Sequence, residues 1–220
     1  MKLPVHSAAA LVAFTLTLGV TVLAQQPQPP QKQPSTPDIL LDPSKLNATA
    51  PDMYKVLVEA SVGTFVIQVH RAWAPNGADR FYNLVKGGYY NDCRFFRVVK
   101  NFMAQFGIHG DPAVNAVWNR QFLPPDRARL SNTRGRVTFA QGSADTRSTQ
   151  VFINFGDNSK LDIDSFAPFG EVVTSMVLVE RIYAEYGEAP VQDLIQAAGN
   201  PYLQQVFPRL SYIRKATVEE

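Results

Sequence analysis

Short runs rich in β-branched and aromatic residues recur along most of the chain, and they constrain its fold more than any other feature. Residues 54–60 (YKVLVEA) and 64–70 (TFVIQVH) are separated by a glycine-containing turn, which predicts a β-hairpin. Longer helical patterns occupy residues 74–86 and 175–184, and a short helix is expected near residues 201–206. Many short strands and few helices indicate a closed antiparallel barrel. The other expected strands are residues 94–99, 102–107, 136–140, 150–154, 169–174 and 211–217.

The start of the chain has the pattern of an export signal. Lys2 precedes an apolar run at residues 8–20 (AAALVAFTLTLGV), and residues 22–24 (VLA) place small side chains at the positions that a signal peptidase reads. We therefore expect residues 1–24 to be a cleaved signal peptide. A retained membrane anchor is the alternative, although the run is short for a full span. The protein is expected to be exported to the periplasm, with secretion or membrane tethering as the other possibilities.

Residues 25–51 differ in composition from both neighbouring segments. Seven prolines fall there, with glutamines early in the segment and Ser, Thr and Asp later. Such a stretch has too few apolar residues to build a core, so we expect a disordered, extended linker that acts as a spacer. A docking site for a proline-recognising domain is the alternative interpretation. The folded domain is then expected over residues 52–220.

Composition argues against several classes of function. The formal net charge is +2 and no strong charge run occurs, which favours neither nucleic acid nor a membrane surface as a partner. Cys93 is the one cysteine, so it has no partner for an internal disulfide, and we expect it to be a small, partly buried apolar residue rather than a reactive thiol. His70 and His109 lie in no metal-binding motif, and neither a metal nor a cofactor is expected.

The sequence gives little support for acid–base catalysis by a carboxylate pair or for a nucleophilic serine. Asp162 and Asp164 stand two apart, which is more typical of a solvated or capping pair than of general acid–base catalysis. Serines 143, 148 and 159 have no neighbouring histidine that could act as a base. Residues 95–107 (FFRVVKNFMAQFG) are more distinctive, because Arg97 stands near Phe102, Met103 and Gln105. This segment is either an apolar binding surface beside one cation and one amide, or a buried hairpin with Arg97 in an ion pair.

Three segments in the same order resemble the cyclophilin family. FFRVVKNFMAQFG resembles the cyclophilin signature FHRIIPGFMCQGG, and residues 135–154 (GRVTFAQGSADTRSTQVFIN) resemble GxxSMANxGxxxxxSQFFI. Residues 161–162 (LD) and 169–172 (FGEV) resemble WLDxxHVVFGxV, and residues 74–86 resemble the helix PxxxxNFxxL. The resemblance covers residues 52–185. Residues 186–220 are expected to form a C-terminal extension, with an insertion at 188–207 and a closing strand.

The resemblance implies a mainly β fold: a closed eight-stranded antiparallel barrel capped by two α-helices. It also implies a peptidyl-prolyl cis/trans isomerase (EC 5.2.1.8) that acts on proline-containing polypeptides as a monomer and assists the folding of exported proteins. Arg97 is the implied catalytic residue, which donates a hydrogen bond to the prolyl nitrogen of the twisted transition state. The implied substrate-binding residues are Phe102, Met103, Phe152 and Leu161 around the proline ring, Gln105, Gln150, Ala140 and Gln141 along the peptide backbone, and Phe166 at the rim.

Three positions depart from the family pattern. Lys160 stands where the family often has tryptophan, Phe166 where it often has histidine, and Gln141 where asparagine is common. We expect activity with an altered peptide preference and weak binding of cyclosporin-type ligands. The alternatives are a weakly active or inactive cyclophilin-fold module that holds proline segments, and a structural envelope protein that acts through its terminal extensions.

Overall fold

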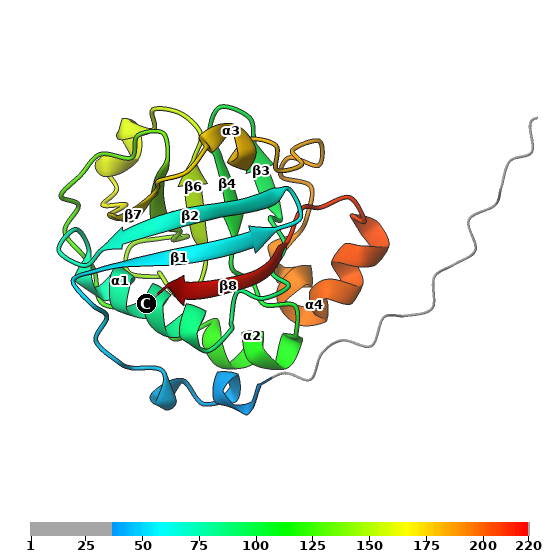
Figure 1. The fold of residues 1–220 in the computed structure, drawn as a ribbon. Helices are drawn as coiled ribbons and strands as arrows, with labels where there is room; N and C mark the ends of the chain where they lie inside the picture. Colours follow the sequence, from blue (N-terminus) through cyan, green and yellow to red (C-terminus); the bar gives the residue numbers. More distant parts are fainter. Residues whose placement is uncertain (1–36, 220) are drawn as a thin grey trace, which may run out of the picture. The chain divides into compact units, whose positions relative to one another are not determined.

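The computed structural model describes residues 37–219, so the expected signal peptide and the first part of the expected linker lie outside the described residues (Figure 1). The strands predicted from the sequence all form, with ends shifted by at most a few residues. They are β1 (Met53–Ala60), β2 (Gly63–His70), β3 (Arg97–Val99), β4 (Met103–Phe106), β5 (Arg136–Phe139), β6 (Val151–Asn154), β7 (Pro168–Val172) and β8 (Ile213–Glu219).

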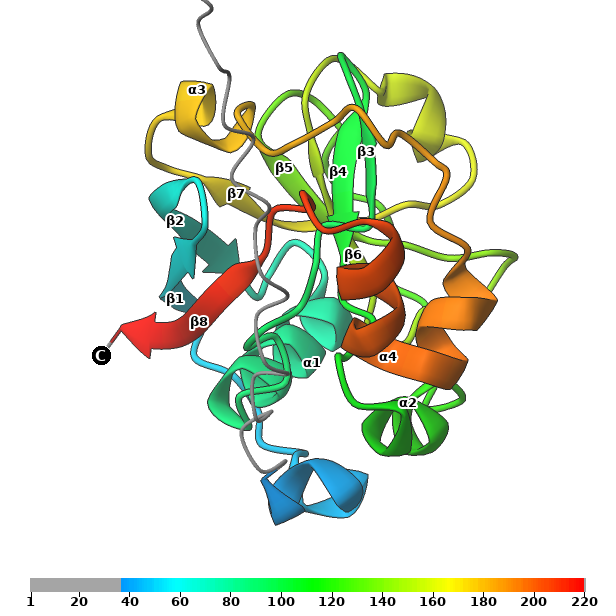
Figure 2. The same ribbon diagram turned by 90° about the vertical axis from the view of Figure 1, so that its right-hand side faces the viewer.

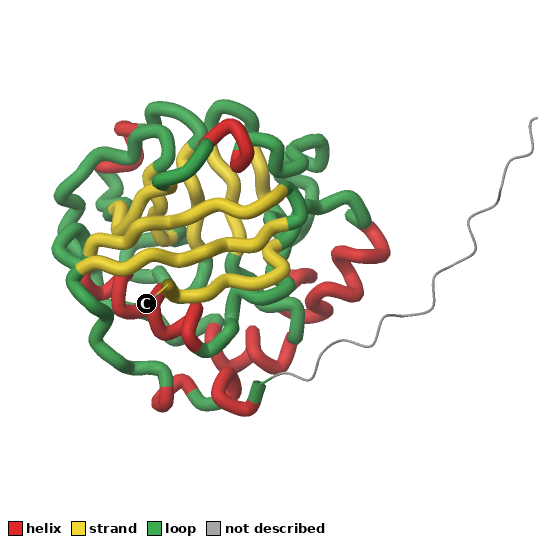
Figure 3. Tube along the Cα trace, viewed as in Figure 1, coloured by secondary structure: helices red, strands yellow, loops and turns green. Residues whose placement is uncertain are grey.

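These strands form one antiparallel sheet of eight strands that curls into a barrel (Figure 3). Their order is β3-β4-β6-β5-β7-β2-β1-β8, so strands far apart in the chain become neighbours. The two edges meet just before β3 and β8, where Arg94 and Tyr212 form an isolated antiparallel bridge. The amide of Phe95 also donates to the carbonyl of Ser211 at 2.9 Å. The expected closing strand therefore completes the barrel as β8.

Alternate residues of the strands fill the barrel. Phe65, Ile67 and Val69 of β2 point inward and are fully buried, while the intervening side chains face outward. Phe169 of β7 lies 5.0 Å from the ring of Phe81 on α1 (Pro75–Lys86), which packs across one end of the barrel (Figure 1). Because side chains occupy the interior, a binding site has to lie on the outside of this barrel.

The expected helix at residues 175–184 is wrong in length. Only α3 (Met176–Val179) forms there, and a series of turns follows it. Two of the four helical residues are β-branched valines, and the hydroxyl of Ser175 makes no capping hydrogen bond at the start of the helix. A helix that was not predicted, α2 (Pro112–Trp118), begins instead where the side chain of Asp111 accepts the Ala113 amide at 2.9 Å.

The linker prediction is wrong for residues 37–51. They form two short 3-10 helices, η1 (Asp38–Leu41) and η2 (Pro43–Lys45), and Leu40 is completely buried. The indole of Trp118 donates to the carbonyl of Leu40 at 2.7 Å. Farther on, the Asn83 side chain on α1 makes hydrogen bonds with both the amide and the carbonyl of Ala48, at 2.9 and 2.7 Å. The segment is thus part of the folded domain despite its prolines.

The expected insertion at residues 188–207 contains α4 (Gln192–Val206), which is longer than the short helix predicted near its end (Figure 2). The helix is kinked at Gly199, which has a φ of 61°, a conformation that favours glycine. A Cβ atom at this position would also clash with the carbonyl oxygen of Gly110. Ile195 and Leu203 of α4 pack against Phe96 and Ile108 in a small core outside the barrel. Within residues 37–219, every helix is too short or too polar to cross a membrane.

Candidate functional site

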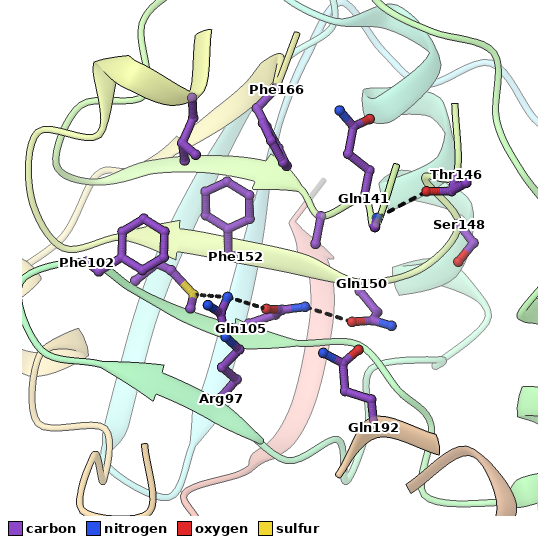
Figure 4. A pocket seen from close by; sticks show the side chains of 14 residues that line it. Arg97, Phe102, Gln105, Gln141, Thr146, Ser148, Gln150, Phe152, Phe166 and Gln192 are labelled. Atoms are coloured by element: carbon purple, nitrogen blue, oxygen red, sulfur yellow. Dashed lines mark hydrogen bonds between the residues drawn. The ribbon is translucent and has the colours of Figure 1, made fainter. Parts of the chain in front are cut away.

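A pocket of about 310 Å³ lies on the outer face of the sheet, beside β3, β4 and β6 (Figure 4). Every site residue expected from the sequence lines this pocket, although those residues span positions 97 to 166. Four further residues complete its wall. The full lining is Arg97, Phe102, Met103, Gln105, Ala140, Gln141, Gly142, Thr146, Ser148, Gln150, Phe152, Leu161, Phe166 and Gln192.

Strand register places the central residues side by side. Arg97 of β3 lies opposite Gln105 of β4, and Gln105 lies opposite Phe152 of β6. Period-2 alternation separates the two faces of each strand: Ala104 and Phe106 enter the barrel core, whereas Met103 and Gln105 face the pocket. The site therefore follows from strand pairing between β3, β4 and β6.

A row of polar side chains crosses the floor of the pocket. Arg97 Nη1 donates to Gln105 Oε1 at 3.2 Å, and Gln105 Nε2 donates to Gln150 Oε1 at 2.8 Å (Figure 4). At the other end of the row, Arg97 Nε donates to Glu188 Oε1 at 2.6 Å. These bonds fix the orientation of the Gln105 amide, because its oxygen accepts from Arg97 while its NH2 group donates to Gln150.

An apolar wall stands next to this row. Met103 and Phe152 are almost completely buried, and Phe152 meets Phe166 edge to face, with ring centroids 5.9 Å apart. The guanidinium carbon of Arg97 lies 5.7 Å from the centroid of the Phe102 ring. The site can accommodate a small apolar ring and direct a cationic N–H donor at an atom beside it.

Phe102 and Leu161 are held in place from the back of the pocket. The chain turns at Asn101, which has a φ of 62°, and the Phe102 carbonyl accepts from the Phe155 amide and from Asn158 Nδ2, both at 2.8 Å. Leu161 lies on η3 (Ser159–Asp162), and its amide donates to the Asn158 carbonyl at 2.8 Å. A buried asparagine thus supports both apolar residues.

Asp162 has a structural role at this site. Its carboxylate accepts hydrogen bonds from the Ser131 hydroxyl at 2.5 Å and from the Asn132 amide at 3.0 Å. Burial alone would raise the pKa of Asp162, but these hydrogen bonds outweigh it and hold the pKa below its ordinary value. Asp162 is therefore a structural residue that fixes η3 against the neighbouring loop.

The loop that carries Thr146 and Ser148 is held by a buried ion pair. Between those two residues, Arg147 Nη1 donates to Asp126 Oδ2 at 3.0 Å, and both side chains are nearly inaccessible. Asp126 also accepts the amides of Asn76 and Gly77 at 2.9 Å each, at the start of α1. Farther along the pocket rim, Gln141 Nε2 donates to the Asp164 carbonyl at 2.8 Å.

The other chemically interesting residues lie away from the pocket. Cys93 is completely buried, more than the partial burial expected, and burial raises the pKa of its thiol well above the ordinary value. Burial also lowers the pKa of His109, against the opposing effect of Asp111. Residues 37–219 contain no group of three or more His, Cys, Asp or Glu side chains placed to hold a metal ion.

Sequence reasoning missed several lining residues. Gly142, Thr146 and Ser148 lie inside the run 135–154 that suggested the site, so that run already contained a signal for them. Gln192 begins α4 and extends toward the polar row (Figure 4). Glu188 is 91 residues from Arg97, and no pattern in the sequence pointed to their contact.

Comparison with known proteins shows which family this chain resembles. The family model described as cyclophilin type peptidyl-prolyl cis-trans isomerase/CLD matches residues 55–199. The human protein peptidyl-prolyl cis-trans isomerase-like 3 is 29% identical over 164 residues, which cover 68% of this chain and 99% of that protein. A peptidyl-prolyl cis-trans isomerase of Acinetobacter baylyi is 31% identical over 132 residues, covering 58% of this chain and 70% of the relative.

Solved structures support the same architecture. A crystal structure of a cyclophilin type peptidyl-prolyl cis-trans isomerase from Cryptosporidium parvum matches with a TM-score of 0.59 and covers 76% of this chain and 98% of its own. A second structure of that protein, in the presence of the dipeptide ala-pro, matches with a TM-score of 0.57. Sequence identity is 17% in both cases, so these two matches support the fold alone.

Proposed function

The chain belongs to the cyclophilin-type peptidyl-prolyl cis-trans isomerase family, and on that premise we propose that the pocket around Arg97 binds X-Pro segments and catalyses their isomerisation. One observation carries the proposal: Arg97 Nη1 and the apolar wall of Phe102, Met103 and Phe152 share one cavity. A cation beside a pocket that fits a proline ring is the arrangement the reaction requires.

The physical obstacle is the partial double bond of the peptide group. Rotation about it has a barrier of about 18–20 kcal/mol, and uncatalysed X-Pro exchange takes roughly tens to hundreds of seconds. Twisting the bond breaks the resonance and leaves a lone pair on the prolyl nitrogen. A donor placed at that nitrogen therefore stabilises the twisted state more than either planar isomer, and this difference lowers the barrier.

Arg97 is the donor in this mechanism. Its Nη1 group lies on the pocket side of the guanidinium, 3.2 Å from Gln105 Oε1 and 3.9 Å from Met103 Sδ. A donor already held in place needs little reorganisation when the lone pair develops. The rigid fork of a guanidinium also keeps one edge bound to protein while the other faces substrate, which an ammonium group cannot do.

The rest of the pocket holds the substrate while one bond rotates. Phe102, Met103, Phe152 and Leu161 surround the proline ring, and Phe166 closes the rim. Gln105 and Gln150 hydrogen-bond the peptide backbone together with the main chain at Ala140 and Gln141. Because both sides of the X-Pro bond are held in one site, part of the binding energy is used to keep that bond in the orientation needed for rotation.

We assign the enzyme to the folding of exported proteins, in the periplasm. The support is the apolar run at residues 8–20, followed by Val22 and Ala24 at the two positions that a signal peptidase reads, which is typical of a cleaved signal peptide. Mass spectrometry of the protein from the extracellular and periplasmic fractions should show a new N-terminus after Ala24. Recovery of the intact chain from the cytoplasm would contradict this assignment.

The activity itself is tested by proline exchange. Adding the purified protein to an X-Pro peptide should speed cis/trans exchange, measured by NMR exchange spectroscopy at equilibrium. The Arg97→Ala variant should lose most of the acceleration while still binding the peptide. If the wild type binds the peptide and leaves its exchange rate unchanged, the chain is a proline-segment binding module and the enzymatic proposal is wrong.

A further inference from the structure

The segment before α4 runs along the outer edge of β3 and is fixed there by its backbone. The amide of Val98 on β3 donates to the Gly187 carbonyl at 3.1 Å. Gly187 adopts a φ of 52°, and its own amide donates to the Ala184 carbonyl at 3.0 Å. The amide of Ala189 closes a second turn on the Tyr186 carbonyl at 2.9 Å. Glu188 therefore projects from a defined turn rather than from an open loop.

The chain is anchored at the start of this turn and again beyond it. Tyr186 packs with Phe207 and with the small core of Phe96, Ile108, Ile195, Leu203 and Leu210. At the α4 kink, Asn200 Nδ2 donates to Asp92 Oδ2 at 2.9 Å, just upstream of β3. The insertion thus carries its own buried contacts, and these place Glu188 and Gln192 beside the pocket.

Glu188 holds the back edge of the Arg97 guanidinium. Its Oε1 atom lies 2.6 Å from Nε and 2.5 Å from Nη2 of Arg97. The third nitrogen, Nη1, instead contacts Gln105 and Met103 on the pocket side. A guanidinium held at Nε and Nη2 cannot rotate about its Cδ–Nε bond without breaking both contacts, so its Nη1 edge stays directed at the pocket.

We propose that Glu188 is a positioning residue for the isomerase reaction, which fixes Arg97 with Nη1 turned toward the prolyl nitrogen. This inference rests on the proposed function of the Arg97 pocket. It gives the inserted segment a part in catalysis: without Glu188, the guanidinium samples other orientations and reaches the reactive one less often. The effect falls on kcat, since Glu188 itself does not line the pocket where peptide binds.

The contact favours positioning over inhibition. An inhibitory carboxylate would occupy the donor that the substrate needs, whereas Glu188 leaves Nη1 to the pocket. The Glu188 side chain is 60% exposed and that of Arg97 31% exposed, so the ion pair is solvated on one side. Exposed ion pairs contribute modestly, and we expect a loss of about two- to fivefold in kcat when the carboxylate is removed.

The test compares Glu188→Gln, Glu188→Ala and Glu188→Asp with the wild type in the exchange assay. Glu185→Gln is the matched control, because Glu185 lies in the same segment and pairs with Lys100 at 2.6 Å, away from the Arg97 pocket. Glu188→Ala and Glu188→Gln should lower kcat with little change in KM, and Glu188→Asp should recover part of it. The Glu185→Gln variant should match the wild type.

Two readouts separate positioning from general loss of structure. The Arg97 Nε–H resonance in NMR should be protected from solvent exchange in the wild type and in Glu185→Gln, but not in Glu188→Ala. In the Arg97→Ala background, Glu188→Gln should have no further effect on the exchange rate. Wild-type kcat in Glu188→Ala, or a kcat above wild type, overturns the inference.

The outcomes also separate this inference from the function on which it rests. If Arg97→Ala loses activity and the Glu188 variants do not, the isomerase proposal stands and the positioning role fails. If the wild-type protein and Arg97→Ala exchange the peptide equally, the proposed function itself fails. An equal loss of kcat in the Glu185→Gln control would show that the segment is merely structural, which also overturns the inference.

Discussion

Arg97 and Gln105 face each other across the β3–β4 pair, and Arg97 Nη1 donates a hydrogen bond to Gln105 Oε1 at 3.2 Å. Gln105 in turn donates to Gln150 at 2.8 Å, so a single amide links the cation to the next hydrogen-bonding group of the pocket. The strand register and the amide chemistry together place Arg97 Nη1 beside Gln105 in the pocket.

Replacing Gln105 with leucine removes the hydrogen-bonding amide and leaves a shorter, apolar side chain. We expect kcat/KM for X-Pro exchange to fall by about tenfold, because a buried hydrogen bond to a charged group is worth roughly 1.5–3 kcal/mol. Gln68→Leu is the control, since Gln68 lies on β2 and contacts His70. Equal activity of the two variants would show that the Arg97–Gln105 contact has no part in catalysis.

The buried N-terminal segment leads to a stability prediction. Leu40 is completely buried, and its carbonyl accepts from the Trp118 indole, so Leu40→Ala should lower the free energy of unfolding by about 2–4 kcal/mol. Leu41→Ala is the matched control, because that neighbour is 45% exposed and should change stability by less than about 0.5 kcal/mol. Urea unfolding followed by tryptophan fluorescence measures both. Equal stabilities would mean that residues 37–51 do not pack on the domain.

The buried imidazole of His109 predicts a loss of stability in mild acid. Its Nδ1 accepts the Asp111 amide at 2.9 Å, and burial holds its pKa below the ordinary 6.5, while Asp111 and Asp92 oppose that shift. Below about pH 6.5 the unfolded chain therefore binds a proton that the folded protein does not, so stability falls as the pH is lowered through this window and is fully present above it.

Denaturant unfolding between pH 8 and pH 5 tests this prediction. The wild type should lose stability on acidification more steeply than His109→Gln, in which no imidazole titrates. Parallel curves for the wild type and His109→Gln would contradict the assignment of the acid sensitivity to His109.

Lys160 suggests why cyclosporin-type ligands should bind weakly. Its Nζ lies 5.7 Å from the centroid of the Phe102 ring and brings a charge to the pocket rim, where the family often has tryptophan. Lys160→Trp should raise the affinity for cyclosporin A by about tenfold, since a new aromatic contact adds roughly 0.5–1.5 kcal/mol beyond its buried area. Lys160→Ala separates removal of the charge from addition of the ring. Equal affinities of the two variants, measured by calorimetry, would refute this explanation.

Much of the fold could be predicted because its signals are local. The hairpin of β1 and β2 follows from alternating apolar residues around a glycine turn, and α1 begins at Pro75 as the pattern indicates. The failures arise where tertiary contacts override composition. The composition of the proline-rich segment predicts disorder. In the structure, however, Leu40 is hydrogen-bonded by Trp118 of α2 and Ala48 by Asn83 of α1, and neither contact can be predicted from the local sequence.

The same distinction applies to the site. Arg97, Met103 and Gln105 are close in sequence and share one strand pair, so a local motif could indicate them. The Arg97–Glu188 ion pair and the place of Gln192 in the pocket wall depend on how the insertion packs against Phe96 and Ile108, which requires the folded structure. A contact between residues as far apart in the chain as Arg97 and Glu188 cannot be predicted from a local sequence motif.

The rate of proline exchange by the wild type, Arg97→Ala and Arg97→Lys tests the central claim most directly. Arg134→Ala is the matched control, because Arg134 pairs with Glu180 outside the Arg97 pocket. Loss of a preorganised donor should lower kcat/KM by about a hundredfold or more in Arg97→Ala, with little recovery in Arg97→Lys. Arg134→Ala should match the wild type. Equal exchange rates for the wild type and Arg97→Ala would contradict the assignment of Arg97 as the catalytic residue.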